Sequence, residues 1–437
     1  MADLRTTFAG IASPNPFWLA SAPPTDKAYN VHRAFEAGWG GVVWKTLGED
    51  GPPIVNVSGP RYGALHATDR RVIGFNNIEL ITDRPLQTNL DEIRQVKRAW
   101  PERALVVSLM VPCEEKAWKS ILPRVEDTGA DGVELNFGCP HGMSERGMGS
   151  AVGQVPEYIE MVTAWCKQHG RLPVIVKLTP NITDIRQPAR AAKAGGADAV
   201  SLINTVSSIM GVDLERMAMS PGIDGMGSHG GYCGPAVKPI ALNMVAQIGR
   251  DAATRGLPLS GIGGIGTWRD AAEYIALGCG TVQVCTAAMV YGFKLVQDMV
   301  DGLANFMDEQ GYASVEAFRG KALASVTDWQ HLNLNYTEKA VIDQGLCIRC
   351  GRCHIACEDT SHQAISAVKD GKRHFEVIDS ECVGCNLCTT VCPVPECITM
   401  RRLPAGELDA RTGQAVRGER LAWTHHPNNP MRVVRVD

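Results

Sequence analysis

The 437-residue sequence predicts an α/β protein in which an eight-stranded β/α barrel precedes a small cysteine-rich domain. Two patterns lead to this prediction. From about residue 10 to residue 300, short and continuously apolar runs alternate with amphipathic helical stretches, as is typical of parallel strands buried on both faces. Near the C-terminus, nine of the 15 cysteines fall between Cys347 and Cys397, which favours a metal-binding module over a disulfide framework.

Eight apolar runs are strand candidates, and helical patterns stand between most of them. Eight such β/α units predict a (β/α)₈, or TIM, barrel. The candidate strands are 17–21, 40–46, 105–110, 131–137, 173–179, 198–205, 257–264 and 281–286, and the clearest helical patterns are 30–39, 90–100, 155–169 and 184–196.

These patterns divide the chain into four segments. We expect the barrel to cover residues 1–305, a helical linker 306–337, a ferredoxin-like α+β domain 338–402, and a polar tail 403–437. The connection at 204–239 is long and rich in Gly and Met, which makes it a candidate lid over the barrel.

Composition excludes two classes of partner. The net charge of −4 offers no basic field for nucleic acid, and no apolar run is long enough to span a bilayer. Asp3 stands where a signal peptide would be basic, and Pro14 and Pro16 interrupt the first apolar stretch. We therefore expect a cytoplasmic protein.

Polar residues follow most of the predicted strands. In a (β/α)₈ barrel the C-terminal ends of the strands meet on one rim, where the active site is built. Cys139 begins a glycine-rich loop just beyond that rim, three residues after Asn136. The other rim residues are Ser21 and Ala22, Lys45 and Thr46, Lys177, and Asn204 and Thr205.

A glycine-rich loop follows the seventh predicted strand. Gly261, Gly263 and Gly266 satisfy the G-x-G-x-x-G spacing of a dinucleotide site, but the next strand ends without the acidic residue that would bind a ribose. In a barrel the loops after strands 7 and 8 form the usual phosphate site. Gly263 and Gly264, with the turn at Cys285 and Thr286, therefore favour a mononucleotide such as FMN over NAD.

Two cysteine runs with C-x₂-C-x₂-C-x₃-C spacing occupy the C-terminal domain. This spacing is typical of bacterial ferredoxins with two [4Fe-4S] clusters, in which the fourth cysteine of each run ligates the other cluster. Zinc is the alternative, but it needs only four ligands, usually in two separated pairs. Cys397 is left over, and we expect it to be a buried thiol near a cluster. The predicted ligand sets are Cys347, Cys350, Cys353 and Cys392, and Cys382, Cys385, Cys388 and Cys357.

This combination resembles the dihydropyrimidine dehydrogenase family. The resemblance runs from Asn15 to Met400, and its specific motifs are "AFEAGWG", "NNIELI", "CPHGMSERGMG", "KLTPNITDI" and "NTVSSIMG". Within the family, the chain looks like the stand-alone bacterial catalytic subunit and like the C-terminal half of the eukaryotic enzyme. Dihydroorotate dehydrogenases share the barrel, but neither the whole set of motifs nor a ferredoxin domain fused at this end.

The resemblance implies a set of cofactors, partners and site residues. Cys139 would be the acid/base. NAD and FAD would act only through a separate flavoprotein partner, in a heterotetramer, because the FAD- and nicotinamide-binding half of the eukaryotic chain has no counterpart here. FMN would be held by Ser21, Ala22, Lys45, Thr46, Asn136, Lys177, Gly234, Gly263, Gly264, Cys285 and Thr286, and the pyrimidine by Asn77, Glu79, Asn136, Asn204 and Thr205.

The chemistry of pyrimidine reduction suits these residue types. A hydride must reach C6 of uracil and a proton must reach C5. A thiol with a pKa of about 8.5 is mostly protonated at neutral pH and can donate that proton. Asn amides match the alternating N–H and C=O groups of the ring. Glu79 can accept from a ring N–H and would repel the carboxylate of orotate, while Lys45 and Lys177 would stabilise negative charge on the flavin.

Three functions stay open at this point. The first is a pyrimidine reductase subunit acting on uracil or thymine. The second is a dihydroorotate-type dehydrogenase with an attached ferredoxin domain. The third is an electron-transfer subunit whose barrel is only a scaffold, which predicts neither FMN nor a role for Cys139.

Overall fold

The computed structural model describes residues 2–51, 53–140 and 146–432, and the chain divides into two compact units, Met1–Val326 and Thr327–Asp437. The first unit extends past the expected boundary at residue 305, which lies inside helix α10 (Leu295–Gln310). It does so because Val315 and Phe318, beyond that helix, are buried in the core of the first unit.

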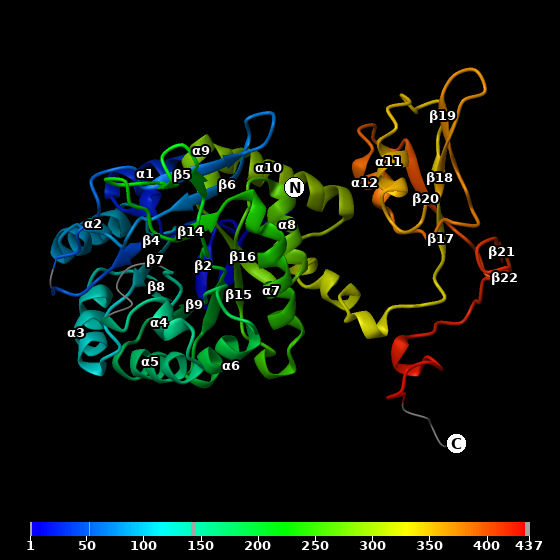
Figure 1. The fold of residues 1–437 in the computed structure, drawn as a ribbon. Coiled ribbons are helices and arrows are strands. Elements are labelled where there is room, and N and C mark those ends of the chain that lie inside the picture. The colour runs from blue at the N-terminus through cyan, green and yellow to red at the C-terminus, as the bar shows by residue number, and fades with distance from the viewer. Residues whose placement is uncertain (1, 52, 141–145, 433–437) are drawn as a thin grey trace, which may run out of the picture. The chain divides into compact units, whose positions relative to one another are not determined.

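The first unit is built on a closed barrel of eight parallel strands, which confirms the predicted fold (Figure 1). All eight predicted runs form its strands, in sequence order around the barrel, and the last strand pairs with the first. Almost every strand residue is buried, as continuously apolar runs require. The strands are β3 (Phe17–Leu19), β4 (Gly41–Leu47), β7 (Ala104–Leu109), β8 (Gly132–Asn136), β9 (Val174–Lys177), β10 (Ala199–Leu202), β15 (Leu259–Ile262) and β16 (Cys279–Val284).

Amphipathic helices surround the barrel (Figure 1). In α1, Val31, Ala34 and Phe35 recur at helical spacing and are buried, so one stripe of the helix packs on the strands. The helices are α1 (Ala28–Ala37), α2 (Leu86–Ala99), α3 (Glu115–Glu126), α4 (Ser150–Gly153), α5 (Pro156–His169), α6 (Arg186–Ala194), α7 (Lys238–Arg250), α8 (Trp268–Ala276), α9 (Thr286–Tyr291) and α10. Among the described residues, no helix combines the length and the apolar character that crossing a membrane requires.

An N-terminal hairpin closes the bottom of the barrel. It consists of β1 (Thr6–Phe8) and β2 (Ile11–Ser13), and it places Phe8 and Ile11 in a buried cluster with Trp18 and Ala104, near the starts of strands β3 and β7. The rings of Phe8 and Trp18 meet edge to face at 5.7 Å. The opposite rim of the barrel is therefore the end that stays available for a site.

Two excursions from the barrel combine into a second sheet that the sequence did not predict. The chain after β4 forms β5 (Tyr62–His66) and β6 (Val72–Asn77), and the long connection after β10 contributes β11 (Val206–Ser208) and β14 (Gly230–Cys233). These strands pair in the order β11-β14-β6-β5. The candidate lid is thus ordered in part by strand pairing, and it also holds a hairpin of β12 (Gly211–Asp213) and β13 (Ala218–Ser220).

The cysteine-rich part of the second unit, residues 338–402, contains two short helices and two antiparallel strand pairs. Strand β17 (Glu338–Ile342) pairs with β20 (Ile398–Arg402), and β18 (Ile365–Val368) pairs with β19 (His374–Val377). Helices α11 (Arg352–Glu358) and α12 (Leu387–Val391) each begin within a cysteine run. This arrangement agrees with the small α+β domain expected for two [4Fe-4S] clusters.

The C-terminal tail folds back on the linker at the start of this unit. It forms a small hairpin of β21 (Leu408–Asp409) and β22 (Gln414–Ala415), and Leu334 N donates to Leu421 O at 2.7 Å. The expected linker 306–337 is accordingly split, its first part packing with the barrel and its last part with the tail.

Candidate active site and cysteine cavities

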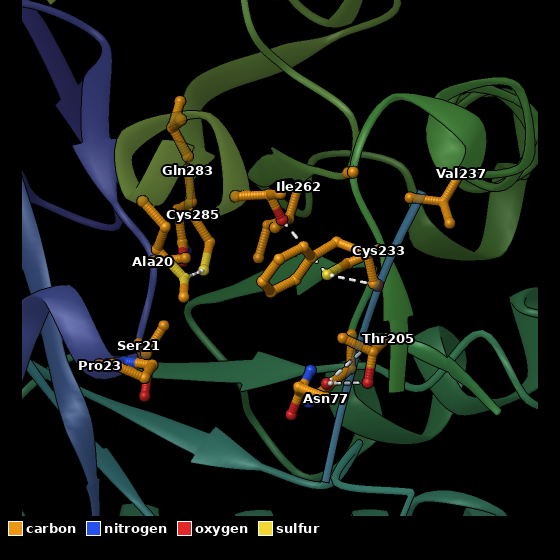
Figure 2. Close-up of a pocket in the computed structure, with 18 of the residues that line it drawn as sticks. Ala20, Ser21, Pro23, Asn77, Thr205, Cys233, Val237, Ile262, Gln283 and Cys285 are labelled. Atoms are coloured by element: carbon orange, nitrogen blue, oxygen red, sulfur yellow. Dashed lines mark hydrogen bonds between the residues drawn. The ribbon is translucent and has the colours of Figure 1, made fainter. Parts of the chain in front are cut away.

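One pocket lies at the C-terminal ends of the barrel strands, where the fold class predicts an active site. Figure 2 shows side chains from the end of β3 and from β16 on one side of it, and Asn77, Thr205 and Cys233 on the other. The structure brings every predicted FMN and pyrimidine residue to this pocket. Its lining includes Ser21, Ala22, Lys45, Thr46, Asn77, Glu79, Asn136, Cys139, Lys177, Asn204, Thr205, Gly234, Gly263, Gly264, Cys285 and Thr286.

A chain of hydrogen bonds ties the ends of five strands, β3, β4, β7, β8 and β10, together at the pocket. Thr46 Oγ1 lies 3.0 Å from Ser21 Oγ and 2.8 Å from Ser108 Oγ. Asn136 Nδ2 donates to Thr46 Oγ1 at 3.0 Å, and Asn204 Nδ2 donates to Asn136 Oδ1 at 3.0 Å. These amides are therefore held in one orientation before any ligand arrives.

Lys177 is anchored by a carboxylate inside the barrel. Its Nζ lies 3.5 Å from Oε1 of Glu134, which is fully buried. Ser201 Oγ and Gln283 Nε2 donate to the other oxygen of Glu134 at 2.8 and 2.9 Å. Among the described residues, Gln283 Oε1 is a buried acceptor without a hydrogen-bond partner, and Gln283 lines the pocket. A buried acceptor of this kind suits a ligand that brings an N–H group.

Glu79 lies in a second charge network at the opposite wall. Lys45 Nζ donates to Glu79 Oε1 at 2.8 Å, and Arg61 Nη1 donates to Oε2 at 3.1 Å. Asp26 Oδ2 is 3.3 Å from Lys45 Nζ. Burial acts to raise the pKa of the Glu79 carboxyl, but the hydrogen bonds and charges of Lys45 and Arg61 outweigh it, so the pKa lies below its usual value. The Glu79 carboxylate thus lines the pocket with its negative charge already neutralised by Lys45 and Arg61.

Glycine geometry shapes the predicted phosphate loop. Gly263 and Gly264 have φ of +131° and +69°, a region that side chains rarely adopt. A Cβ on Gly264 would stand 2.7 Å from Lys238 Cβ and 3.0 Å from Gly234 O. Asp270 fixes the start of α8 by accepting from Gly266 N at 3.0 Å. Only glycine therefore fits at positions 263 and 264, and neither places a side chain between the pocket and the backbone.

Cys139 is buried at the edge of the pocket against an apolar cluster. It is 8% exposed and packs with Ile81, Met110 and Met148. Its carbonyl accepts from Ser150 N at 3.1 Å, which fixes the backbone that carries the thiol. The glycine-rich sequence after Cys139 also predicts a loop that can close over a substrate; residues 141–145 of the motif "CPHGMSERGMG" lie outside the described residues, so this closure stays a prediction.

The long excursion after β10 reaches the Cys139 loop. Its His229 Nε2 lies 3.1 Å from Pro140 O. The second sheet also carries Asn77 and places it against Gly231, whose carbonyl accepts from Asn77 Nδ2 at 3.2 Å. The excursion therefore borders the thiol and supports one of the predicted pyrimidine residues.

In the second unit, the eight predicted cluster ligands surround two cavities. Each cavity takes three thiols from one run and the fourth from the other run, in the partition that the spacing predicts. Among the described residues, no three His, Cys, Asp or Glu side chains converge on a point that would suit a single metal ion. The first cavity is lined by Cys347, Cys350, Cys353 and Cys392, and the second by Cys357, Cys382, Cys385 and Cys388.

Comparison with known proteins agrees with both units. The dihydroorotate dehydrogenase family matches residues 3–307, and the 4Fe-4S dicluster domain family matches residues 340–400. A relative from Escherichia coli (strain K12), named NAD-dependent dihydropyrimidine dehydrogenase subunit PreA, is 41% identical over 412 residues, which are 94% of this chain and 97% of that protein. The match includes the barrel and the cysteine domain together. The chain belongs to the dihydropyrimidine dehydrogenase family.

Two further relatives are similar to this dihydropyrimidine dehydrogenase family member over most of its length. The chloroplastic dihydropyrimidine dehydrogenase (NADP(+)) of Arabidopsis thaliana is 41% identical over 350 residues, 78% of this chain and 82% of its own length. The catalytic subunit of dihydroorotate dehydrogenase B (NAD(+)) of Pyrococcus abyssi is 35% identical over 326 residues, covering 73% of this chain and 99% of its own. As a member of the dihydropyrimidine dehydrogenase family, the chain is an oxidoreductase.

Sequence reasoning missed several pocket residues of this family member. Tyr62, which lines the pocket, begins β5, and Arg61 precedes it; this strand gave no clear alternating pattern, yet Tyr62 Oη donates to Glu79 Oε2 at 3.2 Å. Cys233 Sγ donates to Phe75 O at 3.1 Å, and burial raises the pKa of this thiol to about 11. The Cys233 contact comes from pairing between distant segments, and the Tyr62 contact from the β5-β6 hairpin, which the sequence pattern did not reveal. The glycines around Cys233 were the one sequence feature that could have pointed to this part of the pocket.

Proposed function

We propose that this chain is the catalytic subunit of a dihydropyrimidine dehydrogenase that reversibly reduces the 5,6 double bond of uracil or thymine. Electrons would arrive from NADH through a partner flavoprotein that holds FAD and through two [4Fe-4S] clusters. The observation that carries the proposal is the convergence of the predicted flavin and pyrimidine residues on one pocket beside a buried thiol. The names of the relatives support the same reaction class.

The pocket fits FMN on three points. Gly263 and Gly264 line the pocket and carry no side chain, so a phosphate could approach this stretch of backbone directly. Gln283 Oε1 is a buried acceptor for a ring N–H, and Lys177 offers a positive charge to the ring. When bound, FMN supplies the hydride for C6 of the pyrimidine. Glu134 holds Lys177 in place, so that this charge does not depend on a flexible side chain.

Cys139 would hold the proton for C5. The thiol packs against Ile81, Met110 and Met148 at the edge of the pocket, and the protonated form of a thiol is the one that can donate. In the reduction the thiol gives its proton to C5, and the thiolate is reprotonated from solvent before the next turnover. In the reverse direction the thiolate takes the proton back.

The pyrimidine would be oriented by amides and a hydroxyl. Asn204 and Asn136 are linked to each other and, through Thr46, to the barrel wall, so their donor and acceptor positions are fixed. Asn77 and Thr205 lie against β14 from two sides, since both pack on Gly231. A rigid set of alternating donors and acceptors matches the ring edge of a pyrimidine.

An anaerobic flavin reoxidation experiment tests the proposed function. We would reduce the chain through a dithionite-reduced carrier and follow flavin absorbance as uracil, thymine or orotate is added. Prompt reoxidation by uracil or thymine, but not by orotate, is expected. Reoxidation by orotate alone would favour the dihydroorotate-type reaction, and a preparation without flavin would favour the scaffold alternative.

A further inference from the structure

The first cysteine cavity has a fifth thiol in its wall. Besides Cys347, Cys350, Cys353 and Cys392, the lining includes Cys397, which is 2% exposed. Cys397 lies in one buried cluster with Cys353, and Cys347 and Cys392 pack against that cluster. A [4Fe-4S] cluster takes four thiolates, so this cavity offers one more sulfur than a cluster uses.

The second cavity has an alanine at the corresponding position. Cys397 immediately precedes Ile398, the first residue of β20, and Ala364 immediately precedes Ile365, the first residue of β18. Ala364 is 3% exposed and lines the second cavity, as Cys397 lines the first. The methyl group of Ala364 therefore fills this position in the second cavity. A thiol at this position is not needed to form such a cavity.

Cys397 has a fixed backbone and a loosely held thiol. Its N–H donates to Val394 O at 3.3 Å, and its carbonyl accepts from Asp343 N at 2.8 Å. The thiol is 3.8 Å from Asp343 O, which is a weak contact for an S–H donor. The side chain can therefore turn toward the cavity while the main chain stays in place.

We infer that Cys397 is a reserve ligand of the first cluster, which binds iron in place of Cys392 when Cys392 is not available. The inference rests on the cluster assignment proposed above. In the exchange, the iron bond to Cys392 Sγ breaks and a bond to Cys397 Sγ forms. Cys397 releases its proton and Cys392 takes one up, so the oxidation state of the cluster does not change. Because Cys392 is only half-buried, water can reach its side chain and protonate it, and a second thiol in the cavity wall can then keep the iron coordinated.

Four variants of the full chain test the inference, two for each cavity. Purified anaerobically, the wild type should contain about eight irons. Cys392→Ala should keep about eight irons with an altered EPR spectrum of the reduced clusters, whereas Cys392→Ala/Cys397→Ala should keep about four. The second cavity has no cysteine beyond its four ligands in its lining, so Cys357→Ala should fall to about four irons. Cys357→Ala/Ala364→Cys should regain the lost cluster.

The outcomes distinguish a failure of the reserve-ligand inference from a failure of the cluster assignment on which it rests. Equal iron loss in Cys392→Ala and in the double variant would overturn the reserve role, and so would full iron content in the double variant. If Cys392→Ala is insoluble, the two variants of the second cavity decide. In that case the inference is overturned if Ala364→Cys fails to restore iron to Cys357→Ala. A wild-type chain without about eight irons would instead refute the cluster assignment itself.

Discussion

Lys45 Nζ lies 2.8 Å from Glu79 Oε1, and Arg61 holds the other oxygen of the same carboxylate at 3.1 Å. The sequence predicted that the negative charge of Glu79 repels orotate, which requires a carboxylate that is not neutralised. In the structure, Glu79 instead faces the pocket paired with two cations. Its negative charge is used to neutralise two cations that would otherwise attract an anionic ligand. Discrimination against orotate then depends on the integrity of this network.

Glu79→Gln should increase the affinity for orotate relative to uracil. The substitution leaves Lys45 and Arg61 without their shared anion, and a carboxylate on the ligand can take its place. We expect a change of about tenfold or more in the ratio of the two dissociation constants, since hydrogen-bonded charge pairs shielded from water contribute at least about 1.4 kcal/mol. Titration of the flavin spectrum with each ligand measures it. Glu92→Gln, which removes a carboxylate paired with Arg84 outside the pocket, is the control and should leave the ratio unchanged.

Glu79 should also contribute to the pH dependence of stability. Its folded-state pKa lies below the usual value of 4.5, so its contribution is present above pH 4.5 and is lost as the pH falls through the lowered folded value. The free energy of unfolding of Glu79→Gln should therefore fall less steeply below pH 4.5 than that of the wild type. Denaturant titrations at a series of acidic pH values compare the two slopes. Identical slopes would contradict the assignment of a depressed pKa.

Cys139→Ala should bind FMN normally but lose turnover by about 10²- to 10⁴-fold, the range expected for removing a general acid. Steady-state rates with uracil and the flavin content of the purified protein check both parts. Cys113→Ala, which removes a half-buried thiol outside the pocket lining, should keep wild-type rates. A fully active Cys139→Ala variant would refute the role of this thiol.

Gly264→Ala should weaken FMN binding by about tenfold or more. Its φ of +69° costs an L-residue about 1–2 kcal/mol, and the added Cβ also stands 2.7 Å from Lys238 Cβ. Gly256→Ala is a matched control, because Gly256 has φ of +81° but open space around it. Both variants should lose similar stability through backbone strain, and only Gly264→Ala should lose flavin. Equal retention of flavin in the two would place the phosphate elsewhere.

Cys385→Ala should separate the two half-reactions. It removes a thiol of the second cavity, so we expect the loss of about four irons while the flavin stays bound. Oxidation of reduced flavin by uracil should persist, but activity driven by NADH and the partner flavoprotein should disappear. The iron content and the two activities are measured on one preparation. Persistence of the NADH-driven rate would count against electron transfer through this cluster.

The barrel and the division of the cysteines were predictable because their signals are local. Eight buried strands leave eight apolar runs, and the turns that bring Cys347, Cys350 and Cys353 together are encoded in their spacing. Rim residues such as Asn136 and Lys177 follow from strand ends. Resemblance supplied Asn77 and Glu79.

The second sheet was not predictable in the same way. Its strands β6 and β14 lie more than 150 residues apart in sequence, as the pairing of Asn77 with Gly231 shows, and each gives only a weak signal alone. Arg61 and Tyr62 were missed because their contact with Glu79 depends on the β5-β6 hairpin, whose strands also gave only a weak signal. The boundary at residue 305 was misplaced because a helix pattern does not reveal which unit the helix packs against.

The exchange of the fourth thiols between the two runs has a consequence for how the C-terminal domain can be divided. Cys357 from the first run completes the wall of the second cavity, and Cys392 from the second run completes that of the first. A chain cut between residues 358 and 381 would not yield a piece with one whole site, but two pieces with none. The two sites are interlocked in sequence, so a fragment of the domain can carry both of them or neither.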